Sequence, residues 1–429
     1  MSEYSGYHGS SLEFLKKNEV VVGDTVKIHS DITYLGIIMP RYEHNDDKHI
    51  VLKLKSGYNI GLEIAKIKEV EKIQDDERIT EKPEEINKNE QLSKVLLLST
   101  GGTIASKIDY RTGAVTPVLT AEELNSSVPE LSSIANIDTK VLLSEYSENI
   151  MPENWLDIAK KINSYSNSDY SGIIIAHGTD TMHYTSAFLS FALRGFPIPI
   201  VLVGSQRSSD RASSDAALNL IGATKFIVEI KTKGVYVVMH NDENDNTIAC
   251  HIGTRVRKNH TSKRGAFQTV GDVPAFMIAE EKIQKNMIKE FYPTKEYFPK
   301  INLNTKIALV KYHPGYDPKL IEQIIQSGYK GIIFEGTGLG HIGKVMYDSV
   351  KKAHEKGLFL GMTSQCIDGR VRMTVYESGR DLLNLGIVPL ENMLPEVALV
   401  KAMWAFGNSE NIKDVKEIML ENIASEISI

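Results

Sequence analysis

The chain has 429 residues, of which 42% are hydrophobic and 24% are charged, as is ordinary for a globular protein. This length predicts more than one domain, and the formal net charge of −6 excludes a uniformly basic surface for nucleic acid. Two cysteines are too few for a disulfide framework, and no apolar run approaches the ~20 residues that a membrane span needs. We therefore expect a cytoplasmic protein with no membrane contact.

Residues 1–75 are predicted to form a small β-barrel module. Short strand-like runs alternate with clusters of Gly, Asn, Asp and Ser, a spacing that is typical of small barrels; the runs are 25–29, 33–40, 49–54 and 58–64. Acidic residues outnumber basic ones over residues 1–90, which disfavours direct binding of nucleic acid. We expect a docking element here. Residues 76–91 carry many charges and Pro83, and they are predicted to be a solvated linker.

Residues 92–290 are predicted to form a catalytic α/β domain. Aliphatic strand-like runs alternate with helical patterns, which indicates a mainly parallel sheet covered on both faces. The predicted strands are 95–99, 140–146, 172–177, 199–204 and 234–239, and the predicted helices are 153–165, 182–195 and 211–228. On the third of these helices, Asp215 and Asn219 are interpreted as capping or packing polar groups.

The remainder of the chain is predicted to be a second, smaller α/β domain. Residues 291–303 contain two prolines and are the expected connector, so that the smaller domain covers 304–429. Amphipathic or buried helices are predicted over 317–328, 394–406 and 412–429. The glycines of 336–340 do not have the spacing of a dinucleotide fingerprint. The overall expectation is thus an N-terminal β-barrel module followed by a two-domain α/β fold.

Two glycine-containing turns carry the candidate chemistry. The first follows the run 95–98 and reads Thr-Gly-Gly-Thr over residues 100–103, and the second, over 177–181, reads His-Gly-Thr-Asp-Thr. Ligands of open α/β sheets bind at the carboxyl ends of strands, where these turns lie. A threonine hydroxyl needs a base to become a nucleophile, and Asp180 could hold a lysine for that task. The residues alone leave three interpretations open, which are catalysis, phosphate binding and a structural turn, although neither phosphate motif is present.

A family resemblance favours catalysis. TGGTIA at 100–105, followed by HGTDT at 177–181, resembles the double signature of the L-asparaginase family. The resemblance continues through 203–220, 254–267, 334–341 and 364–379, and it covers the chain from about Lys94 to its end. The stretch 106–115 and the N-terminal module are most similar to one branch of that family, the D subunits of archaeal-type glutamyl-tRNA(Gln) amidotransferases.

The resemblance implies roles for seven residues. Thr103 corresponds to the nucleophile, and Tyr110 to the tyrosine of a loop that closes over the site. Thr179, Asp180 and Lys258 correspond to a proton relay. The pair that holds the α-amino and α-carboxyl groups of the substrate corresponds to Ser147 and Glu148. Many asparaginases have glutamine where this chain has Glu148, which is a departure from the family pattern.

The resemblance also implies substrates and partners. It predicts release of ammonia from glutamine or asparagine, with no cofactor and no metal in this chain. ATP and Mg²⁺ would act in a partner, the amidotransferase E subunit, which would also make most contacts with Glu-tRNA(Gln). Dimers would form through the asparaginase-type domains. The alternatives are a free-standing cytoplasmic L-asparaginase and a non-catalytic scaffold with the same fold.

Overall fold

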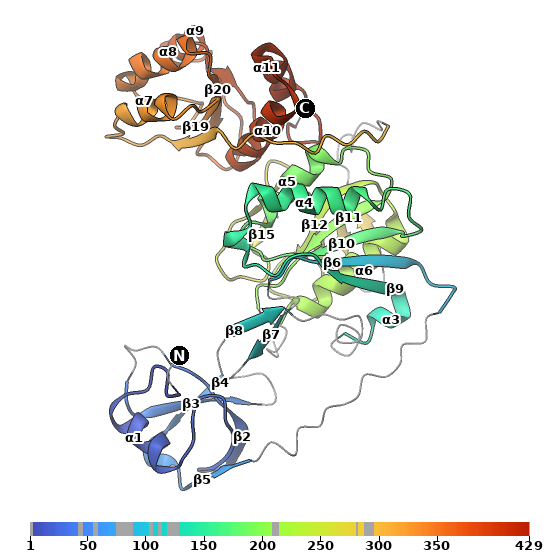
Figure 1. The fold of residues 1–429 in the computed structure, drawn as a ribbon, viewed down its shortest axis with the longest axis vertical. Helices are drawn as coiled ribbons and strands as arrows, with labels where there is room; N and C mark the ends of the chain where they lie inside the picture. Colours follow the sequence, from blue (N-terminus) through green and yellow to red (C-terminus); the bar gives the residue numbers. More distant parts are fainter. Residues whose placement is uncertain are drawn as a thin grey trace.

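The computed structural model describes residues 3–41, 46–54, 59–73, 89–102, 128–207, 214–279, 282–286 and 296–428, and the backbone alone of 106–109 and 114–117. Most of the predicted linker 76–91 and residues 291–295 of the predicted connector 291–303 lie outside these residues, and the proposed domain boundaries stay predictions. Figure 1 shows the order of the elements along the chain.

The N-terminal part is an antiparallel sheet with a helix packed on it. The strand order is β4-β3-β2-β1-β5, and every neighbouring pair is antiparallel. Leu15 of the helix and Val26 and Ile28 of β1 share one buried core. The elements are α1 (Gly9–Lys17), β1 (Thr25–His29), β2 (Thr33–Ile38), β3 (His49–Leu54), β4 (Asn59–Glu63), η1 (Ile64–Lys66) and β5 (Glu69–Lys72). Closure of this sheet into a barrel stays a prediction.

The central part is built on an eight-stranded sheet of order β17-β16-β13-β12-β11-β10-β6-β9. The run from β9 to β12 is parallel, and the remaining strands are antiparallel. These strands are β6 (Lys94–Ser99), β9 (Asn136–Val141), β10 (Gly172–Ala176), β11 (Pro199–Val203), β12 (Gly234–His240), β13 (Ile248–Ile252), β16 (Phe276–Ile278) and β17 (Ile283–Lys285). Two short hairpins lie outside the sheet, β7 (Ser106–Asp109) with β8 (Ala114–Pro117) and β14 (Val256–Lys258) with β15 (Phe267–Thr269).

Successive side chains of the central strands point to opposite faces of the sheet and so belong to two separate hydrophobic cores. Leu96, Leu98, Ile173 and Ile175 face one core, which also contains the apolar side chains of α4 and α5. The intervening residues of the same strands face the core that α3 and α6 cover. Because both faces are covered, the strands are apolar throughout. The helices are α3 (Leu131–Ile134), η4 (Ser147–Asn149), α4 (Pro152–Asn163), α5 (Met182–Ala192) and α6 (Ala216–Ile230).

The C-terminal part is a smaller, wholly parallel sheet of order β18-β19-β20-β21. Helix α10 lies between this sheet and α5, where Trp404 stacks on Phe191 with ring centroids 5.7 Å apart. The far face is covered by α7, α8 and α9 (Figure 1). The elements are β18 (Ile307–Lys311), α7 (Lys319–Gln326), β19 (Gly331–Gly336), η5 (Lys344–Met346), α8 (Tyr347–Glu355), β20 (Phe359–Ser364), α9 (Glu377–Asn384), β21 (Val388–Pro389), α10 (Pro395–Asn408) and α11 (Ile412–Leu420).

These sheets confirm the predicted α/β class, with some local corrections. The run 140–146 was predicted to be a strand, yet β9 ends at Val141 and the chain then turns toward Ser147. The tail helix ends at Leu420, and residues 421–428 continue without helical structure. Periodicity did not predict α1, β5 or the antiparallel strands after β12.

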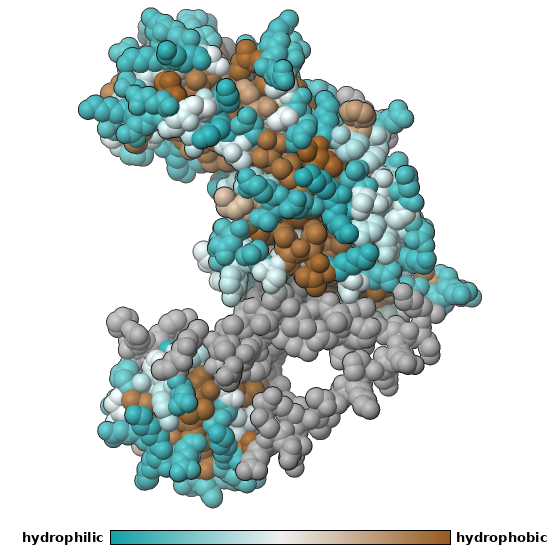
Figure 2. All heavy atoms as spheres, in the orientation of Figure 1, coloured by the Kyte–Doolittle hydropathy of each residue, from teal (hydrophilic) through white to brown (hydrophobic). Residues whose placement is uncertain are grey.

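The surface in the view of Figure 2 is mostly hydrophilic, with hydrophobic residues gathered in the middle of the molecule and at the junction with the C-terminal part. Large hydrophobic side chains that are more than half exposed include Val345, Val375 and Tyr376 of the C-terminal part. Within the described ranges, no helix has the length and apolar character that crossing a bilayer requires.

Candidate active site

The two glycine-containing turns meet because β6 and β10 are parallel neighbours, with Ser99 opposite Ala176. Thr100 is buried, and its Oγ1 donates a hydrogen bond to the Ala176 carbonyl at 3.0 Å. Gly102 has a φ of 84°, and a side-chain carbon there would lie 2.5 Å from the Gly178 nitrogen. Only glycine fits both this backbone conformation and this close approach. The first turn therefore packs directly on the second.

A lysine from a distant hairpin completes the second turn. Lys258 is the last residue of β14, and its Nζ lies 2.8 Å from Thr179 Oγ1 and 2.7 Å from Asp180 Oδ1. The Lys258 side chain is 9% exposed, whereas that of Asp180 is 65% exposed. The threonine hydroxyl thus has an ammonium partner held away from bulk water, with a carboxylate that fixes the position of this ammonium group. This is the geometry that a proton relay requires.

Ser147 and Glu148 lie on the short helix η4 beside the same turn. Ser147 is buried, and its carbonyl accepts a hydrogen bond of 2.6 Å from Thr181 Oγ1. A side-chain carbon on Gly178 would lie 2.9 Å from Ser147 Oγ, so this hydroxyl faces the turn. Glu148 is exposed. Among the predicted site residues, Ser147, Thr179, Asp180 and Lys258 are therefore gathered at one place, with Glu148 adjacent in the chain.

Thr103 and Tyr110 lie outside the described residues. Gly102, which directly precedes Thr103, contacts Gly178, so the position of the chain immediately before the predicted nucleophile is defined. The roles of Thr103 and Tyr110 stay predictions.

Buried histidines around the site were not singled out from the sequence. Nδ1 of His177 lies 2.7 Å from the Gly178 carbonyl, to which it donates, so Nε2 accepts from Thr185 Oγ1 at 2.9 Å. Burial lowers the pKa of His177 to about 4. Burial, followed by the positive charge of Arg257, lowers the pKa of His183 to about 4. Both imidazoles are neutral at pH 7, so neither places a competing cation beside Lys258. The one feature of the sequence that could have identified His177 is its position directly after a strand-like run.

We expect the stability of the protein to fall steeply as the pH is lowered from 7 to 5. His177, His183 and His251 all have a folded-state pKa lowered by burial, to about 4, 4 and 3 respectively. The unfolded chain, with pKa values near ~6.5, therefore binds more protons than the folded one below that pH. Each histidine costs roughly 1.4 kcal/mol at one pH unit below 6.5.

The measurement for this prediction is the urea midpoint as a function of pH. His251 accepts or donates one hydrogen bond through Nδ1, 2.8 Å from Thr269 Oγ1, which asparagine can replace. His251→Asn should therefore reduce the pH slope by about one proton. Equal slopes for this variant and the wild type would contradict this assignment.

No group of three or more His, Cys, Asp or Glu residues in the described part of the chain is arranged to hold a metal ion. The chemistry that these residues offer is that of a hydroxyl, an ammonium group and a carboxylate in contact.

Known families match three ranges that together cover most of the chain. Residues 94–289 match the model "Asparaginase, N-terminal" and 306–419 match the model "Glutaminase/Asparaginase C-terminal domain". Residues 20–73 match the model "GatD N-terminal domain". The D subunit of the Pyrococcus furiosus glutamyl-tRNA(Gln) amidotransferase is 46% identical over 97% of this chain and 97% of its own length. The chain belongs to the family of glutamyl-tRNA(Gln) amidotransferase D subunits.

Other members and solved structures agree with this D-subunit family. The Methanopyrus kandleri D subunit is 43% identical over all of this chain and 95% of its own length. The thermostable L-asparaginase of Thermococcus kodakarensis superimposes with a TM-score of 0.71 at 32% identity, covering 78% of this chain and 99% of that enzyme. A probable cytoplasmic L-asparaginase of Campylobacter jejuni gives 0.66 at 28% identity, with coverage of 77% and 99%. The asparaginase-type fold that the sequence predicted is thus confirmed.

Proposed function

We propose that this chain releases ammonia from the side-chain amide of glutamine, or of asparagine, for a tRNA-dependent amidotransferase. Its family makes it the asparaginase-type component of such an enzyme. The observation that supports amide hydrolysis most strongly is the direct contact of Lys258 Nζ with both Thr179 Oγ1 and Asp180 Oδ1, at the carboxyl edge of the sheet.

The first chemical step is assigned to Thr103. Its Oγ attacks the amide carbon, and the C–N bond then breaks as ammonia leaves with a proton. Water next attacks the ester, which releases glutamate or aspartate and regenerates the hydroxyl. Backbone N–H groups of the two turns would hold the oxyanion, and one such donor is typically worth ~10²–10³ in rate. Lys258, held by Asp180, would exchange protons with Thr179 and a bound water.

Substrate binding is assigned to the η4 turn. Ser147 is buried, and its hydroxyl faces Gly178. Glu148, the next residue of the turn, is exposed and carries a carboxylate. A carboxylate there favours the α-ammonium group of an amino acid. Tyr110 would close over the substrate.

The ammonia would be used by a partner, the amidotransferase E subunit, which would bind ATP, Mg²⁺ and most of the Glu-tRNA(Gln) and convert it to Gln-tRNA(Gln) in the cytoplasm. A homodimer would form through the asparaginase-type parts, for which the exposed Val345, Val375 and Tyr376 offer apolar surface. The acidic N-terminal sheet would dock to a protein and not to nucleic acid.

Ammonia release from glutamine and from asparagine tests this function against the alternative of a free-standing asparaginase. The chain is assayed alone and then with the E subunit, ATP and Glu-tRNA(Gln). We expect slow release by the chain alone and strong stimulation by the loaded partner. Fast release that is indifferent to partner and tRNA would identify a self-sufficient amidase and overturn the proposed role in an amidotransferase.

A further inference from the structure

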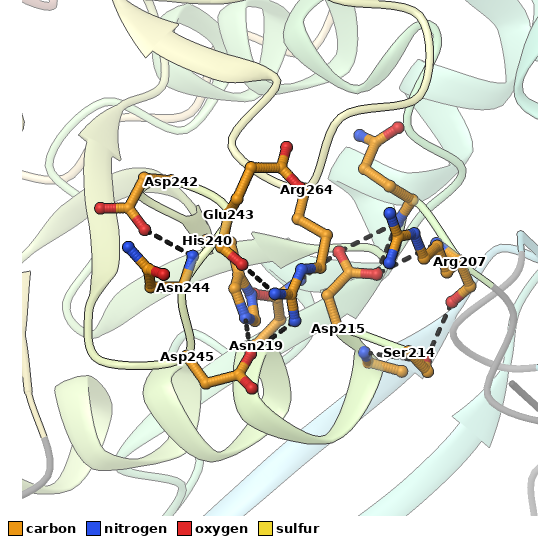
Figure 3. A network of polar contacts seen from close by, with 12 residues as sticks. Arg207, Ser214, Asp215, Asn219, His240, Asp242, Glu243, Asn244, Asp245 and Arg264 are labelled. Atoms are coloured by element: carbon orange, nitrogen blue, oxygen red, sulfur yellow. Dashed lines mark hydrogen bonds and ion pairs between the residues drawn. The ribbon is translucent and has the colours of Figure 1, made fainter. Parts of the chain in front are cut away.

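A network of polar contacts lies between the turn after β11 and the hairpin that carries Lys258, and Figure 3 shows its members from Asp215 to Arg264. At its first end lies Gly204, in the turn after β11. A side-chain carbon on Gly204 would lie 3.0 Å from Thr179 Cγ2 and 2.7 Å from the His177 carbonyl, so this turn packs directly against the site. At its other end lies Arg264, six residues beyond Lys258 in the loop between β14 and β15.

The first half of the network holds the Gly204 turn. Asp215 is fully buried, and its carboxylate accepts hydrogen bonds of 3.0 Å from the backbone nitrogens of Gln206 and Arg207. Asn219, also buried, donates through Nδ2 to the Gly204 carbonyl at 2.9 Å and to Asp215 at 3.1 Å. These two donations fix the orientation of the Asn219 amide, so its Oδ1 must be an acceptor.

The second half runs from Asn219 to the hairpin. His240, the last residue of β12, lies with Nδ1 2.7 Å from Asn219 Oδ1, so Nδ1 carries the proton. Its Nε2 lies 3.3 Å from Asp245 Oδ1. Burial lowers the pKa of His240, and the neutral ring, with its proton on Nδ1, contacts this carboxylate without donating a hydrogen bond to it. The same carboxylate oxygen is 2.5 Å from Arg264 Nη1. Arg264 Nη2 also donates to the Glu243 carbonyl. Arg264 therefore fastens its loop to the β12–β13 turn at two points.

The loop has no room to move toward that turn. A side-chain carbon on Gly265 would lie 2.6 Å from Asp242 Cα and 2.7 Å from the Asn241 carbonyl. The strands of the hairpin keep their register, with Lys258 opposite Phe267. Because the register of the hairpin is fixed, the position of its loop determines the position of Lys258 Nζ. Arg264 binds this loop to the β12–β13 turn.

We propose that Arg264 is a positioning residue that acts through Asp245 to keep Lys258 within hydrogen-bond distance of Thr179. The guanidinium binds the β12–β13 turn and not the reacting groups, so its effect is transmitted by the hairpin. This inference rests on the proposed amide hydrolysis. It extends the site to a residue whose side chain is 13% exposed and paired with a carboxylate that is 61% exposed.

The test is the kinetics of ammonia release by Arg264→Gln and Arg264→Lys in the full chain, at saturating glutamine or asparagine. A displacement of about 1 Å can cost ~10²-fold in rate, so we expect Arg264→Gln to lower kcat ~10- to 100-fold with little change in KM. Arg264→Lys keeps one donor for Asp245 and should recover most of the loss. Asp245→Asn, at an exposed position, should reproduce part of it without affecting folding.

A double-mutant cycle separates positioning from a general loss of structure. Because Arg264 acts through Lys258, Arg264→Gln combined with Lys258→Met should be no slower than Lys258→Met alone, within about threefold. Lys352→Gln, which removes an exposed ion pair with Glu322, is the control and should match the wild type. An unchanged kcat in Arg264→Gln and Asp245→Asn, or multiplicative losses in the cycle, would overturn the proposal. If the wild type releases ammonia and Lys258→Met does not, the proposed amide hydrolysis is supported whatever the Arg264 variants show.

Discussion

Replacing Lys258 with methionine is expected to lower kcat for amide hydrolysis by ~10²- to 10⁴-fold, the usual contribution of a positioned acid–base group. Methionine has a similar length and fills the same space, but it offers no proton to Thr179. KM should change only a few-fold, because the α-amino and α-carboxyl groups are assigned to Ser147 and Glu148. Ammonia release at saturating substrate measures the effect.

The variant should fold normally. The Asp180 side chain is 65% exposed, so loss of its lysine partner leaves a carboxylate that water can solvate. Lys263→Met is the matched control, because Lys263 is an exposed lysine in the same hairpin loop and should not affect the rate. A Lys258→Met protein that keeps its turnover within a few-fold of the wild type would remove Lys258 from the relay.

The second large effect is on stability. Lys401 of α10 and Glu426 of the C-terminal segment are both fully buried, with Nζ and Oε1 2.5 Å apart. Glu426 also accepts hydrogen bonds from the backbone nitrogens of Ile423 and Ala424. Lys401→Met would leave the Glu426 carboxylate buried without a counter-charge, which typically costs ~3–5 kcal/mol. Chemical denaturation should show a loss of this size.

A paired substitution tests the cause of that loss. Lys401→Met combined with Glu426→Gln removes both charges, so the double variant should recover a substantial part of the lost stability. Recovery is expected to be incomplete, because Lys401 Nζ also donates to the Glu421 carbonyl at 2.5 Å. A Lys401→Met protein that loses less than ~1 kcal/mol, or a double variant less stable than both single ones, would contradict the account.

This segment also supports the site. The Thr254 hydroxyl donates to the Ala424 carbonyl at 2.7 Å, and Arg255 Nη1 donates to the Glu426 carbonyl at 3.2 Å. Both residues directly precede β14, which carries Lys258. The base of the hairpin is thus held by the C-terminal segment and its loop by Arg264.

The central parallel strands could be predicted from the sequence because burial on both faces makes each an uninterrupted aliphatic run. The strand at Ile173–Ile175 is an example. By contrast, β9 begins at Asn136, before the apolar run that suggested a strand, because it is the edge strand of the sheet and only partly buried. The three-residue strands β14 to β17 are too short to show a period. Their pairing depends on tertiary contacts that local sequence does not encode.

Only part of the candidate site could be predicted, because many of its contacts join residues that are far apart in the sequence. Thr179 and Asp180 are adjacent in one turn, so their proximity is local. Lys258, 79 residues beyond Thr179, was identified only through the family resemblance. The roles of Asn219, His240 and Arg264 follow from contacts between helix α6, strand β12 and the loop of the β14–β15 hairpin, and no spacing in the sequence indicates them.

The most direct test of the account is to identify the acylated residue during turnover. The chain is mixed with glutamine, quenched in acid within one turnover, digested and analysed by mass spectrometry. The account predicts a glutamyl ester on Thr103, absent from Thr103→Ala and formed much more slowly in Lys258→Met. An ester on Thr179, or turnover with no ester on any residue, would contradict the assignment of Thr103 as nucleophile and of Thr179, Asp180 and Lys258 as its proton relay.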